Sequence, residues 1–266
     1  MKNALCMALL ASACLLTAGN ASASPFPLYD NFAAPTVDST KWYGGESDYL
    51  TLDAVREITL GHRLHLAATA YSSPNDDGYS SGGTYGLYFL NPEGITAVSY
   101  NVQVDKATAT ACPTNTGAEV VAGPEFRGRF FNTQANPTSQ LGDVEFAIGL
   151  DRRPSDGDGA MTASYIYQEC ANSDCSSRNT IAQGTLGTVP LNQRTTVIVR
   201  WDQANHRFLF NINGKKGASR YRLSDSSAPY SAEKEIDVAH VIVDCAATPR
   251  PQTTMDAYFD NIRVAR

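Results

Sequence analysis

The stretch DVEFAIGLD, Asp143 to Asp151, decides the fold. Its alternate positions hold large apolar side chains, namely Val144, Phe146, Ile148 and Leu150. Successive side chains of an extended strand point to opposite faces. The segment is therefore predicted to be a strand that buries one face and shows the other to solvent or to a ligand.

The same alternation recurs along the chain. It appears over residues 98–104, and again over 197–201 and 208–212, which flank the polar loop 202–206. Two alternating runs joined by a short polar loop indicate a β-hairpin. Many short strands separated by turns indicate a sandwich or barrel and not an α/β fold.

Two further segments complete the prediction of local structure. A second hairpin is expected at Gly61, between residues 56–60 and 64–68. The single helix that we expect is short, beginning near Ser231 and covering residues 232–235. The chain is therefore predicted to contain little helix.

The first 23 residues have the pattern of a secretory signal. Lys2 precedes an apolar run over residues 4–18, and Ala21-Ser22-Ala23 supplies small residues at a cleavage site. A membrane anchor is the competing interpretation, but a span needs roughly 20 apolar residues. Lipidation at Cys14 is a minor alternative. We expect a secreted or periplasmic protein whose residues 24–266 form one domain.

Charge restricts the partners. The net charge of the chain is −6, whereas affinity for nucleic acid needs clustered Lys and Arg. We therefore expect no nucleic-acid partner. No transmembrane segment is expected either, and we expect a monomer.

The cysteines predict disulfides. Two of the six lie in the leader, which leaves four in an exported chain. Cys170 and Cys175 enclose a short polar loop, so their pairing is expected, and Cys112 then pairs with Cys245. A zinc site is the weaker alternative, because no Cys-x-x-Cys pair occurs and no histidine lies near a cysteine.

Both ends of the chain resemble one family. The openings YDNF at 29–32 and VDSTKW at 37–42, and the closing MDAYFDNIRV at 255–264, resemble laminarinase-like glycoside hydrolases (family 16) and related concanavalin A-like lectin modules. The resemblance implies an all-β, two-sheet antiparallel jelly-roll sandwich whose first and last strands lie side by side. It also implies that a glycan binds to the concave sheet.

The catalytic motif of those hydrolases is not complete in this chain. They place Glu-x-Asp-x-x-Glu on a central strand, so that two carboxyls flank the glycosidic bond. No such sextet occurs here. Glu145 and Asp151 share a face, but six positions of extended strand put them roughly 20 Å apart.

The resemblance also implies a structural Ca²⁺, because an Asp in the closing strand of the family commonly binds calcium and Asp260 occupies the matching position. Phe259 and Ile262 cannot both point inward on a regular strand, so a β-bulge is expected beside Asp260. The alternative is that Asp260 only hydrogen-bonds the N-terminal loop.

Charged residues alternate over a second segment. Glu125, Arg127 and Arg129 share one face, and Glu145 lies across from them if the two segments pair. Glu125 and Glu145 are therefore the acid/base candidates, and the two arginines are candidates for clamping an acidic sugar. A salt-bridged outer sheet face is the competing interpretation.

Tyrosine is abundant, with 13 in the chain. A flat ring with a polar tip suits sugar stacking, and the candidates for ligand binding are Tyr85, Tyr88, Tyr165 and Tyr167. Packing is the alternative role, because tyrosine is also a good strand residue.

The function class predicted from these patterns is a secreted or periplasmic carbohydrate-binding, lectin-like module without a cofactor other than the possible calcium. The alternative is a polysaccharide-cleaving enzyme, either a glycoside hydrolase or a polysaccharide lyase. A structural or adhesive surface protein is the second alternative. Fold by itself does not choose among them.

Overall fold

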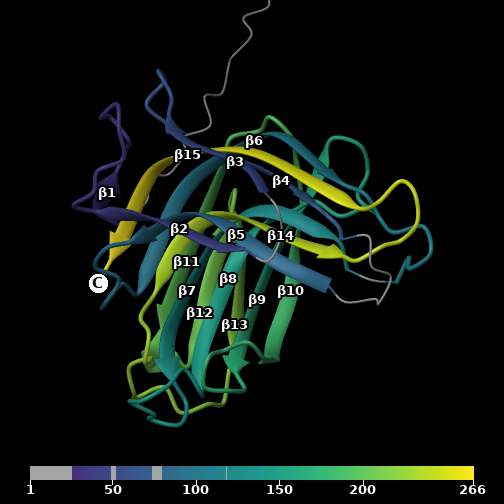
Figure 1. Cartoon of the computed structure of the whole chain (residues 1–266). Helices are drawn as coiled ribbons and strands as arrows, with labels where there is room; N and C mark the ends of the chain where they lie inside the picture. Colours follow the sequence, from purple (N-terminus) through teal and green to yellow (C-terminus); the bar gives the residue numbers. More distant parts are fainter. Residues whose placement is uncertain (1–25, 49–51, 74–79, 118) are drawn as a thin grey trace, which may run out of the picture.

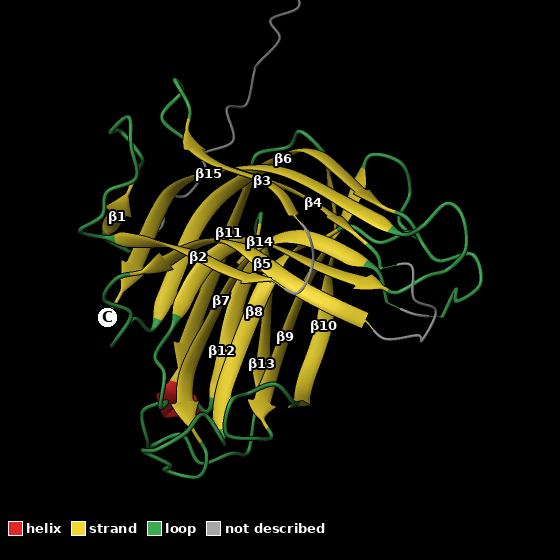
Figure 2. Ribbon diagram, in the orientation of Figure 1, coloured by secondary structure: helices red, strands yellow, loops and turns green. Residues whose placement is uncertain are grey.

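The computed structural model describes residues 26–48, 52–73, 80–117 and 119–266. In this part of the chain regular structure is almost entirely strand, with one 3₁₀ turn, η1, at Gln203–Asn205 (Figure 2). No helix of the described residues is long and apolar enough to span a membrane. The predicted signal peptide and the alternative lipidation at Cys14 lie outside the described residues.

Two antiparallel sheets stack face to face (Figure 1). The first has the order β13 (Lys215–Arg220), β12 (Arg207–Ile212), β11 (Thr195–Asp202), β6 (Ala97–Ala109), β15 (Gln252–Ala265), β4 (Leu64–Tyr71) and β3 (Leu52–Ile58), with β1 (Leu28–Asp30) paired to β15. The second has the order β10 (Arg178–Pro190), β9 (Ala160–Cys170), β8 (Asp143–Asp151), β7 (Val121–Asn132), β14 (Lys234–Val243), β5 (Ser80–Phe89) and β2 (Trp42–Asp48). The predicted all-β jelly-roll sandwich is confirmed.

The core lies between the sheets and is built from the predicted alternation. The inward side chains of β8, from Val144 to Leu150, are almost fully buried. From the other sheet, Tyr100 crosses the core, and its hydroxyl donates a hydrogen bond to the carbonyl oxygen of Ile148 at 3.1 Å. Because every second residue faces inward on both sheets, two flat surfaces interdigitate and exclude water.

The two chain ends meet as the resemblance implied. β1 pairs with β15, with Leu28 opposite Arg263. The expected bulge is also present, because the β15 register shifts between Asp260 and Arg263 and Asn261 has a φ of 52°. The bulge turns both Phe259 and Ile262 into the core.

Local predictions about hairpins and disulfides are confirmed. β11 and β12 form one predicted hairpin and β3 and β4 the other. The disulfides are Cys112–Cys245 and Cys170–Cys175. The first closes a sequence separation of 133 residues and the second one of 5. The first disulfide therefore joins the segments that follow β6 and β14, and the second tightens one local turn.

The predicted helix over residues 232–235 is wrong. Strand β14 begins at Lys234 and pairs with β5 on one side and β7 on the other. Ile236 and Val238 are fully buried by alternation. The free energy of two ladders of hydrogen bonds and two buried side chains outweighs the local helix preference of Glu-Lys-Glu.

Candidate functional site

A groove of about 700 Å³ runs over the outer face of the second sheet. We call this surface, the side of β10-β9-β8-β7-β14-β5-β2 that points away from the core, the groove face. Glu125 and Arg127 of β7 line the groove, and Glu235 of β14 lines a smaller pocket that shares Arg127 with it. Asp237 lies on the same face as Glu235, two residues along the strand.

The register of β7 and β14 brings three carboxyl groups together. Asp237 lies directly opposite Glu125, and Glu235 lies directly opposite Arg127. Directly opposed residues have Cβ atoms about 4.5–5.5 Å apart. The register therefore gathers three acids around one guanidinium, with Glu125 and Arg127 at the groove and Glu235 in the adjoining pocket.

Glycines flank this cluster on both sides. Gly86 of β5 is opposite Asp237, and Gly149 of β8 is opposite Glu125. A Cβ added at Gly86 would lie 2.2 Å from the carbonyl oxygen of Ile236, and one at Gly149 would lie 2.4 Å from that of Pro124. The neighbouring backbones thus approach too closely for any side chain at these positions.

Arg127 holds one of the three acids. Its Nε and Nη2 atoms donate hydrogen bonds to Oε1 of Glu125 at 3.0 and 2.5 Å. A hydrogen bond between two charged groups is stronger than one between neutral groups. Glu125 is therefore the member of the cluster whose ionised form has a direct cationic partner.

Burial shifts the pKa values of all three acids upward. Desolvation raises the pKa of Glu235 to about 7, with Arg127 opposing the rise and Glu125 adding to it. Desolvation, together with the charges of Glu235 and Glu125, raises the pKa of Asp237 well above its usual range. Desolvation also raises the pKa of Glu125, against the effect of Arg127. At neutral pH the cluster therefore retains protons.

Asp237 is the most constrained of the three. It is 0 % exposed, and both of its carboxyl oxygens lack a hydrogen-bond partner among the described residues. An isolated buried carboxylate is costly, so the neutral form is favoured. Perturbed acids clustered in a cleft are typical of functional sites.

Glu145, the other predicted acid/base candidate, has different surroundings. It lies opposite Arg129, as the predicted pairing of the two segments required. Arg127, Arg129 and Arg178 place their Nε atoms 4.0, 3.6 and 3.5 Å from its carboxyl oxygens. Three cations thus surround Glu145, whereas the neighbours of Glu125 include two further acids, Glu235 and Asp237 of β14.

One predicted tyrosine lies on the groove face. Tyr88 hydrogen-bonds Glu235 through its hydroxyl, and its ring stacks on that of Tyr43 with centroids 5.1 Å apart. Desolvation raises the pKa of the Tyr88 hydroxyl, which therefore stays protonated and can donate. The two rings form an aromatic platform beside the acid cluster, and Tyr43 was not among the sequence candidates.

The other three tyrosines point toward the core, as the alternative packing role implies. Tyr167 is fully buried, and its hydroxyl hydrogen-bonds the carbonyl oxygen of Arg220. Tyr165 packs its ring 4.2 Å from that of Phe210, although it also borders the groove. Tyr85 packs against the core under Arg56. Their odd-numbered positions on β9 and β5 place them on the inner faces.

Sequence reasoning missed Glu235 and Asp237. The signal was present, because Glu235-Ile236-Asp237 matches the first two acidic positions of Glu-x-Asp-x-x-Glu and only the sixth position, His240, departs from it. The wrong helix over residues 232–235 hid this strand. His240 itself turns into the core, where its Nδ1 lies 2.7 Å from Oγ1 of Thr253.

Asp260 is paired with a cation of the protein. Nη2 of Arg194 lies 2.7 Å from its carboxylate, and Asn261 donates two further hydrogen bonds to it. Among the described residues no group of three or more His, Cys, Asp or Glu is placed to hold a metal ion. Calcium at Asp260 stays a prediction.

Comparisons with known proteins give similarities of fold. No family model matches the chain, and no curated protein matches it. Among solved structures, the κ-carrageenase of Pseudoalteromonas carrageenovora is 10 % identical over 89 % of this chain and 93 % of its own, with a TM-score of 0.43.

Two others are alginate lyase A1-II′, 9 % identical over 85 % of this chain and 95 % of its own with a TM-score of 0.44, and the carbohydrate-binding module CBM66 of Bacillus subtilis, 9 % identical over 87 % of this chain and 100 % of its own with a TM-score of 0.38. Similarities this distant do not decide what the groove binds or cleaves. The chemistry of the groove has to do so.

Proposed function

We propose that the groove binds a glycan and hydrolyses one of its glycosidic bonds, with Glu235 and Glu125 as the acid and base pair. The observation that carries this proposal is the acid cluster at the groove and its adjoining pocket, where neighbouring strands β7 and β14 present carboxyl groups with raised pKa values. Glycoside hydrolysis needs one protonated and one ionised carboxyl on the two sides of the scissile bond.

The surroundings assign a role to each acid. Glu235, with a pKa of about 7, keeps a proton near neutral pH and donates it to the leaving-group oxygen as that bond breaks. The two hydrogen bonds from Arg127 favour the ionised form of Glu125, and in that form its carboxylate accepts a proton from the water that attacks the anomeric carbon. Water supplies the hydroxyl group of the product, so the reaction needs no other co-reactant.

The test is release of reducing ends from a panel of polysaccharides by the oxidised protein. Glu235→Gln and Glu125→Gln are each expected to lower the rate by about 10²–10⁴-fold, the usual contribution of an acid/base group. Glu93→Gln, on an exposed loop outside the groove, is the matched control and keeps the wild-type rate. An unchanged rate in either groove variant contradicts its assigned role.

Glycan binding without cleavage is the second candidate function. The stacked pair Tyr43 and Tyr88 favours it, because aromatic rings at a groove are suited to hold a sugar ring. If a polysaccharide is retained on an affinity gel and no new reducing ends appear, the function is binding and not hydrolysis. If the product is unsaturated and absorbs ultraviolet light, the reaction is that of a lyase and not a hydrolysis.

A further inference from the structure

A small pocket of about 80 Å³ adjoins the acid cluster. We call it the arginine pocket, because Arg127, Arg129 and Arg178 all line it. The pocket is small, and its three guanidinium groups suit a compact oxyanion such as a carboxylate or a sulfate. Its position beside Arg127 places it next to any sugar bound in the groove.

Arg129 and Arg178 are incompletely paired in this pocket, whereas Arg127 donates two hydrogen bonds to Glu125. The anion that all three arginines share, Glu145, lies 3.5–4.0 Å from each Nε atom, whereas a full charge-assisted hydrogen bond is about 2.7–2.9 Å long. Nε of Arg129 is buried and has no hydrogen-bond partner among the described residues. Guanidinium donors therefore remain for another acceptor.

Glu125 takes up the charge of Arg127, and the other acids only partly offset the charges of Arg129 and Arg178. Glu233 contacts Arg129 at 3.1 Å, but its side chain is 48 % exposed and solvent screens its charge. Glu235 is buried, and desolvation raises its pKa to about 7, so it is largely neutral below that pH. Glu145 is the single buried acid that lies among all three arginines.

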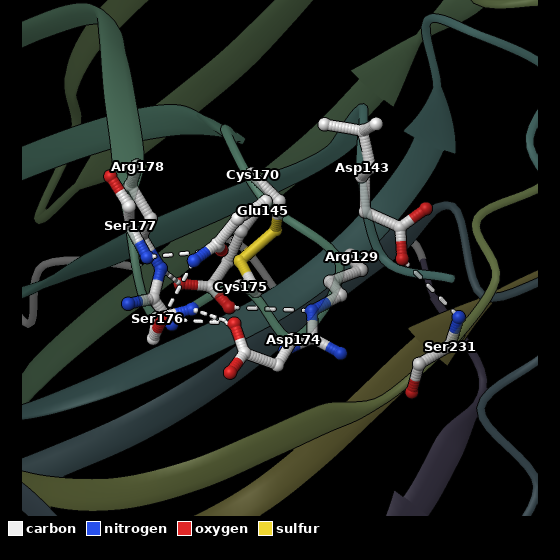
Figure 3. Close-up of a disulfide and its surroundings, with 12 residues drawn as sticks. Arg129, Asp143, Glu145, Cys170, Asp174, Cys175, Ser176, Ser177, Arg178 and Ser231 are labelled. Carbon is white, nitrogen blue, oxygen red and sulfur yellow. Dashed lines mark hydrogen bonds and ion pairs between the residues drawn. A yellow bond between two sulfur atoms is a disulfide. The ribbon is translucent and has the colours of Figure 1, made fainter.

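A disulfide holds Arg178 in place at the edge of the pocket. Cys170 ends β9 and lies opposite Arg178, the first residue of β10, and the Cys170–Cys175 bond closes the turn between them. Asp174 also accepts hydrogen bonds from the backbone and hydroxyl of Ser176. Figure 3 shows Arg178, Glu145 and Arg129 together beside this disulfide. The backbone that carries Arg178 is thus fixed at the pocket edge, and its guanidinium lies 3.5 Å from Glu145, which lowers the entropic cost of binding.

We propose that the arginine pocket binds an acidic substituent, a carboxylate or a sulfate ester, of the glycan in the groove, and that Arg178 determines this specificity. This inference rests on the proposed glycan-binding function and names its substrate class as acidic polysaccharides. Planar guanidinium groups match the geometry of oxyanions and stay charged at all relevant pH values. The net charge of −6 disfavours nonspecific attraction of polyanions, so retention of one requires a local cationic site.

Binding can be tested without knowing the polysaccharide. Sodium sulfate and sodium glucuronate, with glucose as the neutral probe, are titrated into the full oxidised protein while NMR follows the arginine Nε–H resonances. Saturable shifts at the arginine pocket in the millimolar range are expected with one or both anions and not with glucose. Saturation by sulfate alone, by glucuronate alone or by both tells which acidic group the pocket accepts. Absence of a saturable shift with both anions overturns the inference.

Arg178→Gln is the diagnostic variant, because its half-exposed side chain lies at a strand end and its loss leaves the core intact. It is expected to weaken anion binding by about tenfold. Arg194→Gln, which removes a guanidinium paired with Asp260 away from the groove, is the matched control and keeps the wild-type affinity. Equal affinities in the two variants overturn the assignment to Arg178.

The two proposals fail separately. If the protein releases reducing ends from neutral polysaccharides and neither anion binds, the proposed hydrolysis is supported and the proposed specificity for acidic glycans is contradicted. If the anions bind at the arginine pocket but no polysaccharide is cleaved, the proposed anion site is supported and the proposed hydrolysis is contradicted.

Discussion

The outer faces of the two sheets carry similar charged residues in different surroundings. On the first sheet, His65 lies 3.1 Å from Glu57 and 2.9 Å from Asp256, and these carboxylates are 59 % and 32 % exposed. On the groove face, Asp237 and Glu235 are almost fully buried. In both sheets, alternation along a strand points every second side chain away from the core. The neighbouring strands then determine whether that side chain is exposed to solvent.

The largest expected difference between the faces concerns the arginines. Replacing Arg127 by Met leaves the buried acid cluster without its cation and is expected to lower the free energy of unfolding by about 3 kcal/mol. Arg63→Met on the other face removes a stacking contact with the ring of Tyr258 and a long hydrogen bond of 3.5 Å to Gln103, and is expected to cost less than about 1 kcal/mol. Denaturant unfolding measures both, and similar losses would show that the two faces do not differ in this way.

The second largest expected difference between the two outer faces is in how their stability depends on pH. Folding raises the pKa of Glu235 from 4.5 to about 7, so the folded state binds more protons than the unfolded state between these values. The free energy of unfolding therefore falls as pH rises from about 4.5 to about 7, by a few kcal/mol.

Glu235→Gln is expected to flatten this dependence, because glutamine does not titrate. Glu57→Gln, on the exposed face, is the control and should leave the slope unchanged. Asp237 and Glu125, whose pKa values burial also raises, keep part of the slope. Unfolding curves at a series of pH values test this, and an unchanged slope in Glu235→Gln would assign the destabilisation to those two acids.

Replacing glycine by alanine should also have different effects on the two sheets. Gly86→Ala and Gly149→Ala bring a methyl group against backbone carbonyls of β14 and β7, so each is expected to lose about 1–3 kcal/mol of stability. Gly61→Ala, in the turn between β3 and β4, meets nothing nearer than Oγ1 of Thr59 at 3.7 Å and should change stability little. A groove glycine that tolerates alanine would mean that the sheet backbone shifts readily there.

The smallest effect is expected at the exposed ion pair. Asp256→Asn removes one carboxylate from His65 and should cost less than about 1 kcal/mol, because solvent screens the pair. The cost should also shrink as salt is added. A loss as large as that of Arg127→Met would mean that the first sheet also has a buried electrostatic site.

Much of the fold could be predicted because it depends on local pattern. The alternation over Asp143–Asp151 identified a strand and its inner face, and the turn at Gly61 identified a hairpin. The same pattern misassigned residues 232–235, because a short charged segment has no decisive periodicity of its own. Its strand state comes from β5 and β7 on either side, which are distant in sequence.

The candidate site could be predicted only in part. Glu125, Arg127 and Arg129 were recognised as one polar face, and Glu145 was correctly placed across from them. Glu235 and Asp237 were missed, although they lie opposite Arg127 and Glu125. Adjacent strands here come from segments more than 100 residues apart, and the sequence contains no local signal for that pairing.

The sequence by itself determined which side chains face inward, where the chain turns and which cysteines join, because these depend on strand alternation, turn chemistry and spacing. Only the tertiary structure decided which outward side chains meet. The register of β14 against β7 places three acids around Arg127 and removes them from water, and it is this burial that shifts their pKa values and turns a polar stripe into a candidate site.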